Sequence, residues 1–191
     1  MKIKIGFFAI MLFLSLLLSH SLFSLATLLA ALLHELGHIL AARLFKIHFS
    51  ECKMGLYGIG LIPDNSLFSY GQEILLCAAG PVANFLLAFS LFLLLPHYPN
   101  RFLEYLLFSS VALGCLNLIP IRDFDGGRIL RAILSPRCSA AGVERIISVV
   151  SFLCILSVWS LSVYLLIRAS SSLSLFIFSI SLFCRIFIPK P

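Results

Sequence analysis

The feature that most constrains this chain is the apolar run LLAALLHELGHILAARLF at residues 28–45. The run is long enough to enter a bilayer as a helix, yet it carries His34, Glu35 and His38 at its middle. An ionisable side chain at the centre of a membrane helix costs about 2.5–3.5 kcal/mol on insertion scales. Three such side chains within five residues therefore require a chemical reason.

The composition is that of a membrane protein. Of the 191 residues, 61% are apolar and 12% are charged, whereas a soluble domain of this length would carry roughly twice that share of charge. The net charge of +6 is not gathered in a basic block and matches no RNA-binding signature, so we expect no nucleic-acid partner. The six cysteines are scattered without a CxxC pair, which favours small buried hydrophobes.

The apolar runs predict an all-α polytopic membrane protein with about six transmembrane helices, in a single integral-membrane domain over residues 1–191. The runs are roughly 5–21, 24–45, 68–95, 102–119, 144–167 and 171–189. With the amino terminus in the cytoplasm, only Arg101 and Arg168 of the fourteen basic residues lie outside. We therefore expect a multi-pass protein of the cell membrane with cytoplasmic amino and carboxyl termini.

The first apolar run has a second interpretation. MKIKIGFFAIMLFLSLLLSHS has a basic start, an apolar core and small residues near Ser19 and Ser21, as a cleaved signal peptide has. Cleavage would leave the remaining topology unchanged, because residue 22 is external in both cases.

Residues 46–67, KIHFSECKMGLYGIGLIPDNSL, differ from the predicted spans. They are glycine-rich with short alternating stretches, which predict a small membrane-associated β-hairpin after the second helix, on the cytoplasmic side or dipping into the membrane. Because open sheet edges are not tolerated against lipid, this hairpin must lie against protein or water.

The spacing of the HELGH motif suits a metal. On a helix, His34 and His38 lie about 40° apart around the axis and one turn from each other, so both imidazoles can bind one ion. Glu35 is offset enough to reach a water on the metal but is poorly placed as a third ligand. The HExxH pattern is typical of two zinc ligands and a general base. Two histidines hydrogen-bonded to neighbouring helices are the alternative, which would leave Glu35 to be neutralised.

A catalytic zinc usually takes three protein ligands, so a third is expected from another segment. Most other acidic residues lie near predicted helix ends; the exceptions are Asp123 and Asp125, after the fourth span. Gly126 and Gly127 follow Asp125 and allow a tight turn, which would direct a carboxylate back towards a site between helices. Taken alone, Asp125 could equally cap the next helix or pair with Arg128.

Three motifs in order resemble those of the site-2 protease family of intramembrane zinc metalloproteases. They are HELGH at 34–38, GPVAN at 80–84 and NLIPIRDFDGG at 117–127. The likeness covers roughly residues 24–135, and the continuation GGRILRAIL resembles the group of stage IV sporulation protein FB.

The resemblance implies a zinc-dependent intramembrane endopeptidase with one zinc ion per chain. The implied ligands are His34, His38 and Asp125, and the implied catalytic base is Glu35. The Asn of the family's N-x-x-P segment falls on Asn117, which would hold the substrate backbone or the developing oxyanion.

Other motif residues are expected to shape the site. Asn84, at the end of GPVAN, is grouped with Asn117 as a candidate substrate or oxyanion contact. The positions expected to set the backbone are Gly80, Pro81, Pro120, Gly126 and Gly127. Arg122 stands where many members of the family have a second proline, so we expect this loop to have a different conformation. Asp123 is the alternative to Asp125 as a ligand.

The expected substrate is a membrane-embedded or membrane-associated protein that is locally unwound near the cytoplasmic face, because a closed helix hides its carbonyl groups. In the family the hairpin presents an extended substrate by strand addition. The sporulation group implies regulated intramembrane proteolysis that releases a sigma factor from its pro-sequence. We expect no PDZ or CBS domain, so membrane regulatory proteins or the substrate supply would provide control.

Two other functions fit parts of the pattern. A non-proteolytic membrane metal-binding or transport protein could use the same histidines, but it would need a polar path, and the outer halves of the predicted spans offer little beyond Ser. A non-catalytic relative that only binds membrane proteins would be expected to lack Glu35 or a ligand, and all are present.

Overall fold

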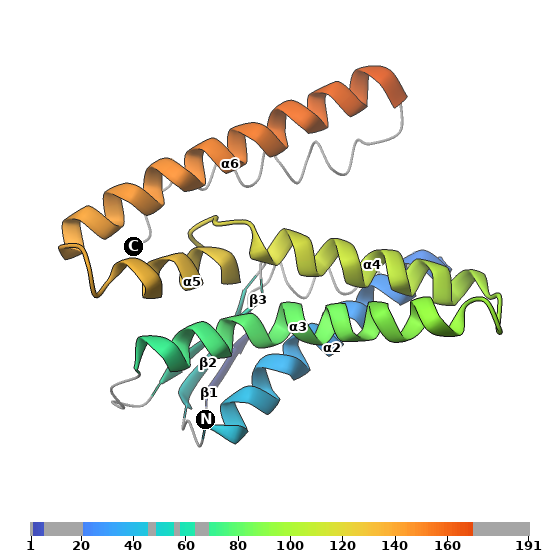
Figure 1. The fold of residues 1–191 in the computed structure, drawn as a ribbon, viewed down its shortest axis with the longest axis horizontal. Coiled ribbons are helices and arrows are strands. Elements are labelled where there is room, and N and C mark those ends of the chain that lie inside the picture. Colours follow the sequence, from blue (N-terminus) through green and yellow to red (C-terminus); the bar gives the residue numbers. More distant parts are fainter. Residues whose placement is uncertain (1, 6–20, 46–48, 56–57, 64–68, 170–191) are drawn as a thin grey trace.

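The computed structural model describes residues 2–5, 21–45, 49–55, 58–63 and 69–169. Four long helices carry most of the described chain (Figure 1): α2 (Leu22–Leu44), α3 (Tyr70–Leu94), α4 (Arg101–Leu118) and α6 (Ala140–Ala169). A short helix, α5 (Asp125–Leu134), lies between α4 and α6. The four long helices are long and apolar enough to cross a membrane.

These helices correspond to four of the roughly six predicted spans. The runs 24–45, 68–95, 102–119 and 144–167 match α2, α3, α4 and α6 to within a few residues. The predicted span 171–189 and all but the first and last residues of the span 5–21 lie outside the described residues.

Three short strands form one small sheet in the order β1-β2-β3. The strands are β1 (Lys2–Ile5), β2 (Phe49–Gly55) and β3 (Gly58–Pro63). β2 and β3 pair antiparallel, with Gly55 opposite Gly58, within the segment for which a hairpin was predicted. β1 pairs parallel to β2 and was not predicted, because its four residues precede an apolar run and its partner is distant in the sequence.

Local sequence signals set the ends of the helices. Ser69 opens α3 with a capping box: its hydroxyl accepts from the Gln72 N–H, and its own N–H donates to the Gln72 side chain. Asn100 caps α4 by accepting from the Phe102 N–H at 2.8 Å. α4 ends two residues before Pro120, which disfavours continuation of the helix.

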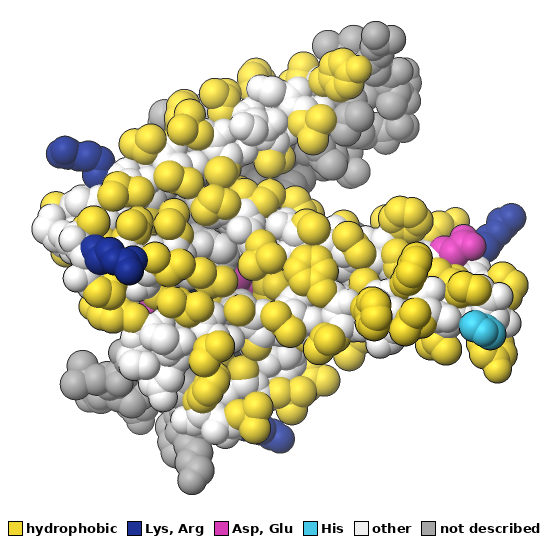
Figure 2. Space-filling model, in the orientation of Figure 1, with side chains coloured by type: hydrophobic (Ala, Val, Ile, Leu, Met, Phe, Trp, Pro, Cys, Tyr) yellow, Lys and Arg dark blue, Asp and Glu magenta, His cyan; other side chains and the backbone are white. Residues whose placement is uncertain are grey.

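Helices α2, α3 and α4 pack together through small side chains on α2. Ala26 and Ala30 are fully buried against Leu91 of α3 and Leu106 of α4. Many larger apolar side chains face outward instead, and they cover most of the face in Figure 2. Contiguous exposed apolar surface of this extent is typical of a protein that contacts other apolar material, which for helices of this length is a bilayer.

Helix α6 packs on α5 and on the loop between α4 and α5 rather than deep in the bundle of α2, α3 and α4 (Figure 1). Polar contacts reinforce this packing at Arg122. Its guanidinium donates to Glu144 at 2.8 Å and to Ser148 at 2.9 Å, and its backbone N–H donates to the buried Ser151 hydroxyl at 2.9 Å. These contacts with α6 therefore fix the loop between α4 and α5 at Arg122, the residue that stands in place of the second proline.

Candidate metal centre

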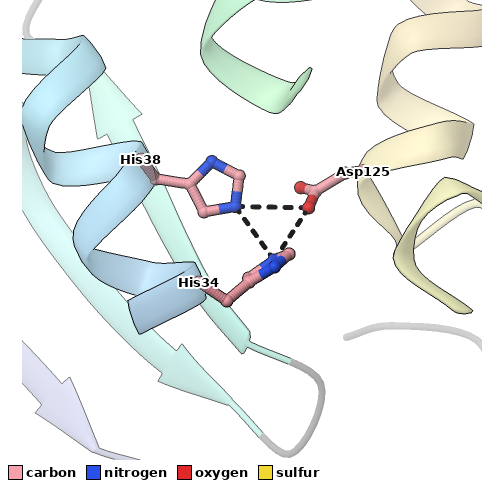
Figure 3. Close-up of side chains that lie close together, drawn as sticks. All are labelled: His34, His38 and Asp125. Carbon is pink, nitrogen blue, oxygen red and sulfur yellow. Dashed lines mark hydrogen bonds and ion pairs between the residues drawn. The ribbon is translucent and has the colours of Figure 1, made fainter. Parts of the chain in front are cut away.

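Helices α2 and α5 bring three polar side chains together (Figure 3). The Nε2 atoms of His34 and His38 lie 3.2 Å apart, and the Asp125 Oδ2 atom lies 3.1 Å from the first and 3.2 Å from the second. The three residues are 5%, 8% and 9% exposed. Among the described residues Asp123 does not belong to this cluster.

The backbone explains why Asp125 rather than Asp123 reaches the histidines. Asp125 is the first residue of α5, and Phe124 occupies the N-cap position, so the Asp125 carboxylate does not act as the cap. Its recorded ion pairs are with the two histidines rather than with Arg128. A Cβ on Gly127 would lie 2.0 Å from the Ile121 carbonyl oxygen, so only glycine allows α5 to begin this close to the preceding loop.

Gly80 of α3 leaves room for both imidazoles. A Cβ at this position would lie 2.4 Å from His38 Nε2 and 2.7 Å from His34 Nε2, closer than any normal contact. The next residue, Pro81, is fully buried inside α3. The GPVAN motif therefore forms the wall of the cluster opposite the histidine-bearing face of α2.

Two residues of α3 contact the outer nitrogens of the histidines. His38 Nδ1 donates to the Leu76 carbonyl oxygen at 2.8 Å, so the lone pair of its Nε2 faces the cluster. The Asn84 amide nitrogen lies 3.1 Å from His34 Nδ1. Sequence reasoning missed Leu76, because a backbone carbonyl has no residue-type signal; its position one turn before Gly80 was the available indication.

The other predicted site residues occupy different settings. Glu35 is half-buried on α2 beside His34. Asn117 is half-buried in the last turn of α4, where its amide donates to the Leu113 carbonyl oxygen at 3.0 Å. Asn84 is fully buried, and its amide contacts His34.

The cluster fits a zinc ion better than it fits a set of hydrogen bonds. If both imidazoles are neutral, the proton of His38 lies on Nδ1 and points away from the cluster. At most one proton, that of His34, is then available for the three close contacts among His34, His38 and Asp125. Ligands at zinc distances of about 2.0–2.2 Å in a tetrahedral arrangement are about 3.3–3.6 Å apart. The observed separations of 3.1–3.2 Å are within about 0.2 Å of the lower end of that range, and zinc commonly binds imidazoles and carboxylates.

Comparison with known proteins gives the family. Residues 22–100 and 97–158 match the model of peptidase family M50. A zinc metalloprotease of Methanocaldococcus jannaschii is 32% identical over 113 residues, which span 56% of this chain and 33% of that protein. The structure of a site-2 protease from Methanocaldococcus jannaschii covers 99% of this chain and 92% of its own, with a TM-score of 0.66 and 21% identity, so it is similar in fold. The family model matches well over half of the residues of this chain, so the chain belongs to peptidase family M50.

Proposed function

We propose that this protein is an intramembrane zinc metalloprotease that hydrolyses peptide bonds of membrane-embedded or membrane-associated proteins near the cytoplasmic face. The observation that carries this proposal is the convergence of His34, His38 and Asp125 on one point, beside Glu35, in a chain with helices able to cross a membrane. Membership of a peptidase family supports hydrolysis of peptide bonds as the reaction.

The ligands of one zinc ion per chain would be His34, His38 and Asp125. When bound, zinc polarises a carbonyl group and lowers the pKa of a coordinated water towards 7. Glu35, next to a ligand on α2, would accept a proton from the attacking water and deliver it to the leaving amine.

Asn117 would hold the carbonyl oxygen of the scissile bond. One of its two amide hydrogens is directed at the Leu113 carbonyl oxygen, so the second would donate to the substrate. Removal of such a donor costs about 2.7–4 kcal/mol of transition-state stabilisation in another protease.

The distribution of basic residues supports a site in the cytoplasmic half of the membrane. His38 lies five residues before Arg43, near the carboxyl end of α2, and Arg122, Arg128 and Arg131 follow the carboxyl end of α4. Arg101 lies at the opposite end of α4. By the positive-inside rule, the end of the bundle nearer the site faces the cytoplasm, together with both chain termini.

The substrate would bind with its backbone extended. Strand β3 is an edge of the small sheet, and an edge strand offers main-chain groups for strand addition. The likeness of GGRILRAIL to the sporulation group supports release of a sigma factor from its pro-sequence as the specific reaction to test first.

A cleavage assay in detergent micelles tests the proposed activity. The probe is a fluorescently labelled, unfolded protein such as reduced and alkylated lactalbumin, incubated with the zinc-loaded full chain. We expect zinc-dependent cleavage by the wild type and at least about 100-fold slower cleavage by Glu35→Gln, with zinc still bound. Zinc binding without cleavage, together with zinc uptake into vesicles that contain the protein, would contradict the proposed protease activity and favour zinc transport instead.

A further inference from the structure

The two histidines differ in what lies behind them. The Leu76 carbonyl oxygen accepts from His38 Nδ1 at 2.8 Å, which keeps the His38 Nε2 lone pair directed into the cluster. Asn84 instead presents its amide nitrogen to His34 Nδ1 at 3.1 Å. If Nδ1 accepts this bond, the single proton of a neutral His34 lies on Nε2, inside the cluster, where it would oppose a cation.

The opposite end of the Asn84 amide is not satisfied. Asn84 is fully buried, and its Oδ1 has no hydrogen-bond partner among the described residues. A buried acceptor without a partner is unfavourable. The two ends of a carboxamide have nearly the same shape, so rotation by about 180° exchanges them without additional space. In the rotated orientation Oδ1 accepts from His34 Nδ1–H, and the His34 Nε2 lone pair faces Asp125 and His38.

We propose that Asn84 is a positioning residue that holds His34 in the tautomer required for metal binding, as Leu76 does for His38. This inference rests on the proposed function, because it requires a metal at the cluster. The imidazole keeps one proton, which moves from Nε2 to Nδ1, so the charge of His34 does not change. Asn84 therefore acts on the site through its hydrogen bond to His34 Nδ1 and does not contact the substrate.

The orientation of the amide would depend on the metal. With Nε2 unprotonated on both histidines, three electron-rich atoms lie 3.1–3.2 Å apart and repel one another unless a cation lies among them. Without a cation, the amide N–H of Asn84 faces His34, and the His34 Nε2–H can donate to Asp125. With a cation, the amide oxygen faces His34 and accepts from its Nδ1–H. Both histidines then donate a hydrogen bond from the nitrogen that faces away from the metal, as metal-binding histidines commonly do.

The zinc affinity of the detergent-purified full chain tests this role, measured by competition with a chromophoric chelator. Asn84→Leu removes the acceptor at similar volume, and we expect it to weaken zinc binding about 10–100-fold, the usual effect of losing such a contact. Asn84→Asp keeps an oxygen acceptor and is expected to bind zinc at least as tightly as the wild type. Ser110→Ala is the control, because Ser110 is also fully buried with no hydrogen-bond partner for its hydroxyl among the described residues, but it lies on α4.

Two results would overturn the inference while the metal site stands: wild-type affinity in Asn84→Leu, or equally weak binding by the Asp and Leu variants. A wild type that binds no zinc would overturn the proposed function and this inference together, before any variant is compared. If Asn84→Leu does not fold, ¹⁵N spectra of the histidines in the zinc-free protein decide. A proton on His34 Nε2 in the wild type and on Nδ1 in Asn84→Asp supports the role, and the same tautomer in both proteins rules it out.

Discussion

The Leu76 carbonyl oxygen of α3 accepts a hydrogen bond of 2.8 Å from His38 Nδ1 of α2. In an uninterrupted helix this carbonyl would accept from the N–H of the residue four positions later, which is Gly80. The same turn of α3 thus orients His38 through its backbone and, at Gly80, makes room for both imidazoles. Metal binding should therefore depend on the backbone of α3 as well as on the ligands.

Gly80→Ala should weaken zinc binding while the helices remain folded. The added Cβ would lie 2.4 Å from His38 Nε2, and the imidazoles can move away more easily than the backbone can. We expect at least about a tenfold loss of zinc affinity by chelator competition, with unchanged helical circular dichroism.

Gly71→Ala is the matched control for Gly80→Ala. Gly71 lies on the same helix, and the nearest atom to an added Cβ would be the Ser69 hydroxyl oxygen, at an ordinary contact distance of 3.8 Å. Zinc affinity equal to that of the wild type in both variants would contradict the packing of Gly80 against the histidines.

Asn117→Ala should slow cleavage without loss of metal. The side chain is half-buried and contacts the carbonyl of its own helix, so zinc content should not change. If its amide stabilises the oxyanion, kcat on the unfolded test protein should fall about 100-fold or more. Cys115→Ser, at an exposed position on the same helix, serves as the control. A variant with normal kcat would remove Asn117 from the mechanism.

Ser151→Ala should destabilise the contact between α6 and the loop that leads to Asp125. The buried hydroxyl accepts from the Arg122 N–H at 2.9 Å, and a partly buried donor that loses its partner costs about 1–3 kcal/mol. Glu144 forms ion pairs with Arg122 and Arg131, and all three side chains are 37–45% exposed, so each pair should contribute less than about 1 kcal/mol. Thermal unfolding in micelles should therefore respond more to Ser151→Ala than to Glu144→Gln.

Ser157→Ala provides the reference for that comparison. Its exposed hydroxyl donates to the Leu153 carbonyl oxygen of the same helix, so the unfolding midpoint should stay within experimental error of the wild type. Equal shifts of the unfolding midpoint in Ser151→Ala and Ser157→Ala would mean that the hydrogen bond between Ser151 and Arg122 does not stabilise the protein.

Removal of zinc should lower the stability of the protein. A ligand that binds only the folded state at a free concentration 100 times its Kd stabilises that state by about 2.7 kcal/mol. Dialysis against a chelator should lower the unfolding midpoint, and added zinc should restore it. Asp125→Ala should show almost no response to either treatment, whereas a full response in that variant would place the metal elsewhere.

Much of the candidate metal site was predictable from helical geometry. The spacing of His34 and His38 places both on one face whatever surrounds them, and the GPVAN and NLIPIRDFDGG motifs indicated the segments that approach that face. The choice between Asp123 and Asp125 needed the structure, because it depends on where α5 begins and on how closely Gly127 lets it approach the loop.

Contacts made by the backbone or between distant segments could not be predicted in the same way. The Leu76 carbonyl has no residue-type signature, and β1 pairs with a strand far along the chain. Arg122 was recognised only as a departure from the family. Its contacts with Glu144, Ser148 and Ser151 depend on how α6 packs, which the nearly uniform apolarity of that helix does not specify.

The most direct test is the zinc content of detergent-purified protein. The wild type and Asp123→Ala should each bind about one zinc per chain, and Asp125→Ala and His38→Ala should bind almost none, because each removes one of the three converging ligands. Circular dichroism and unfolding midpoints confirm that every variant is folded. A folded wild type without zinc, or an Asp125→Ala variant that retains it, would contradict the proposed centre at His34, His38 and Asp125.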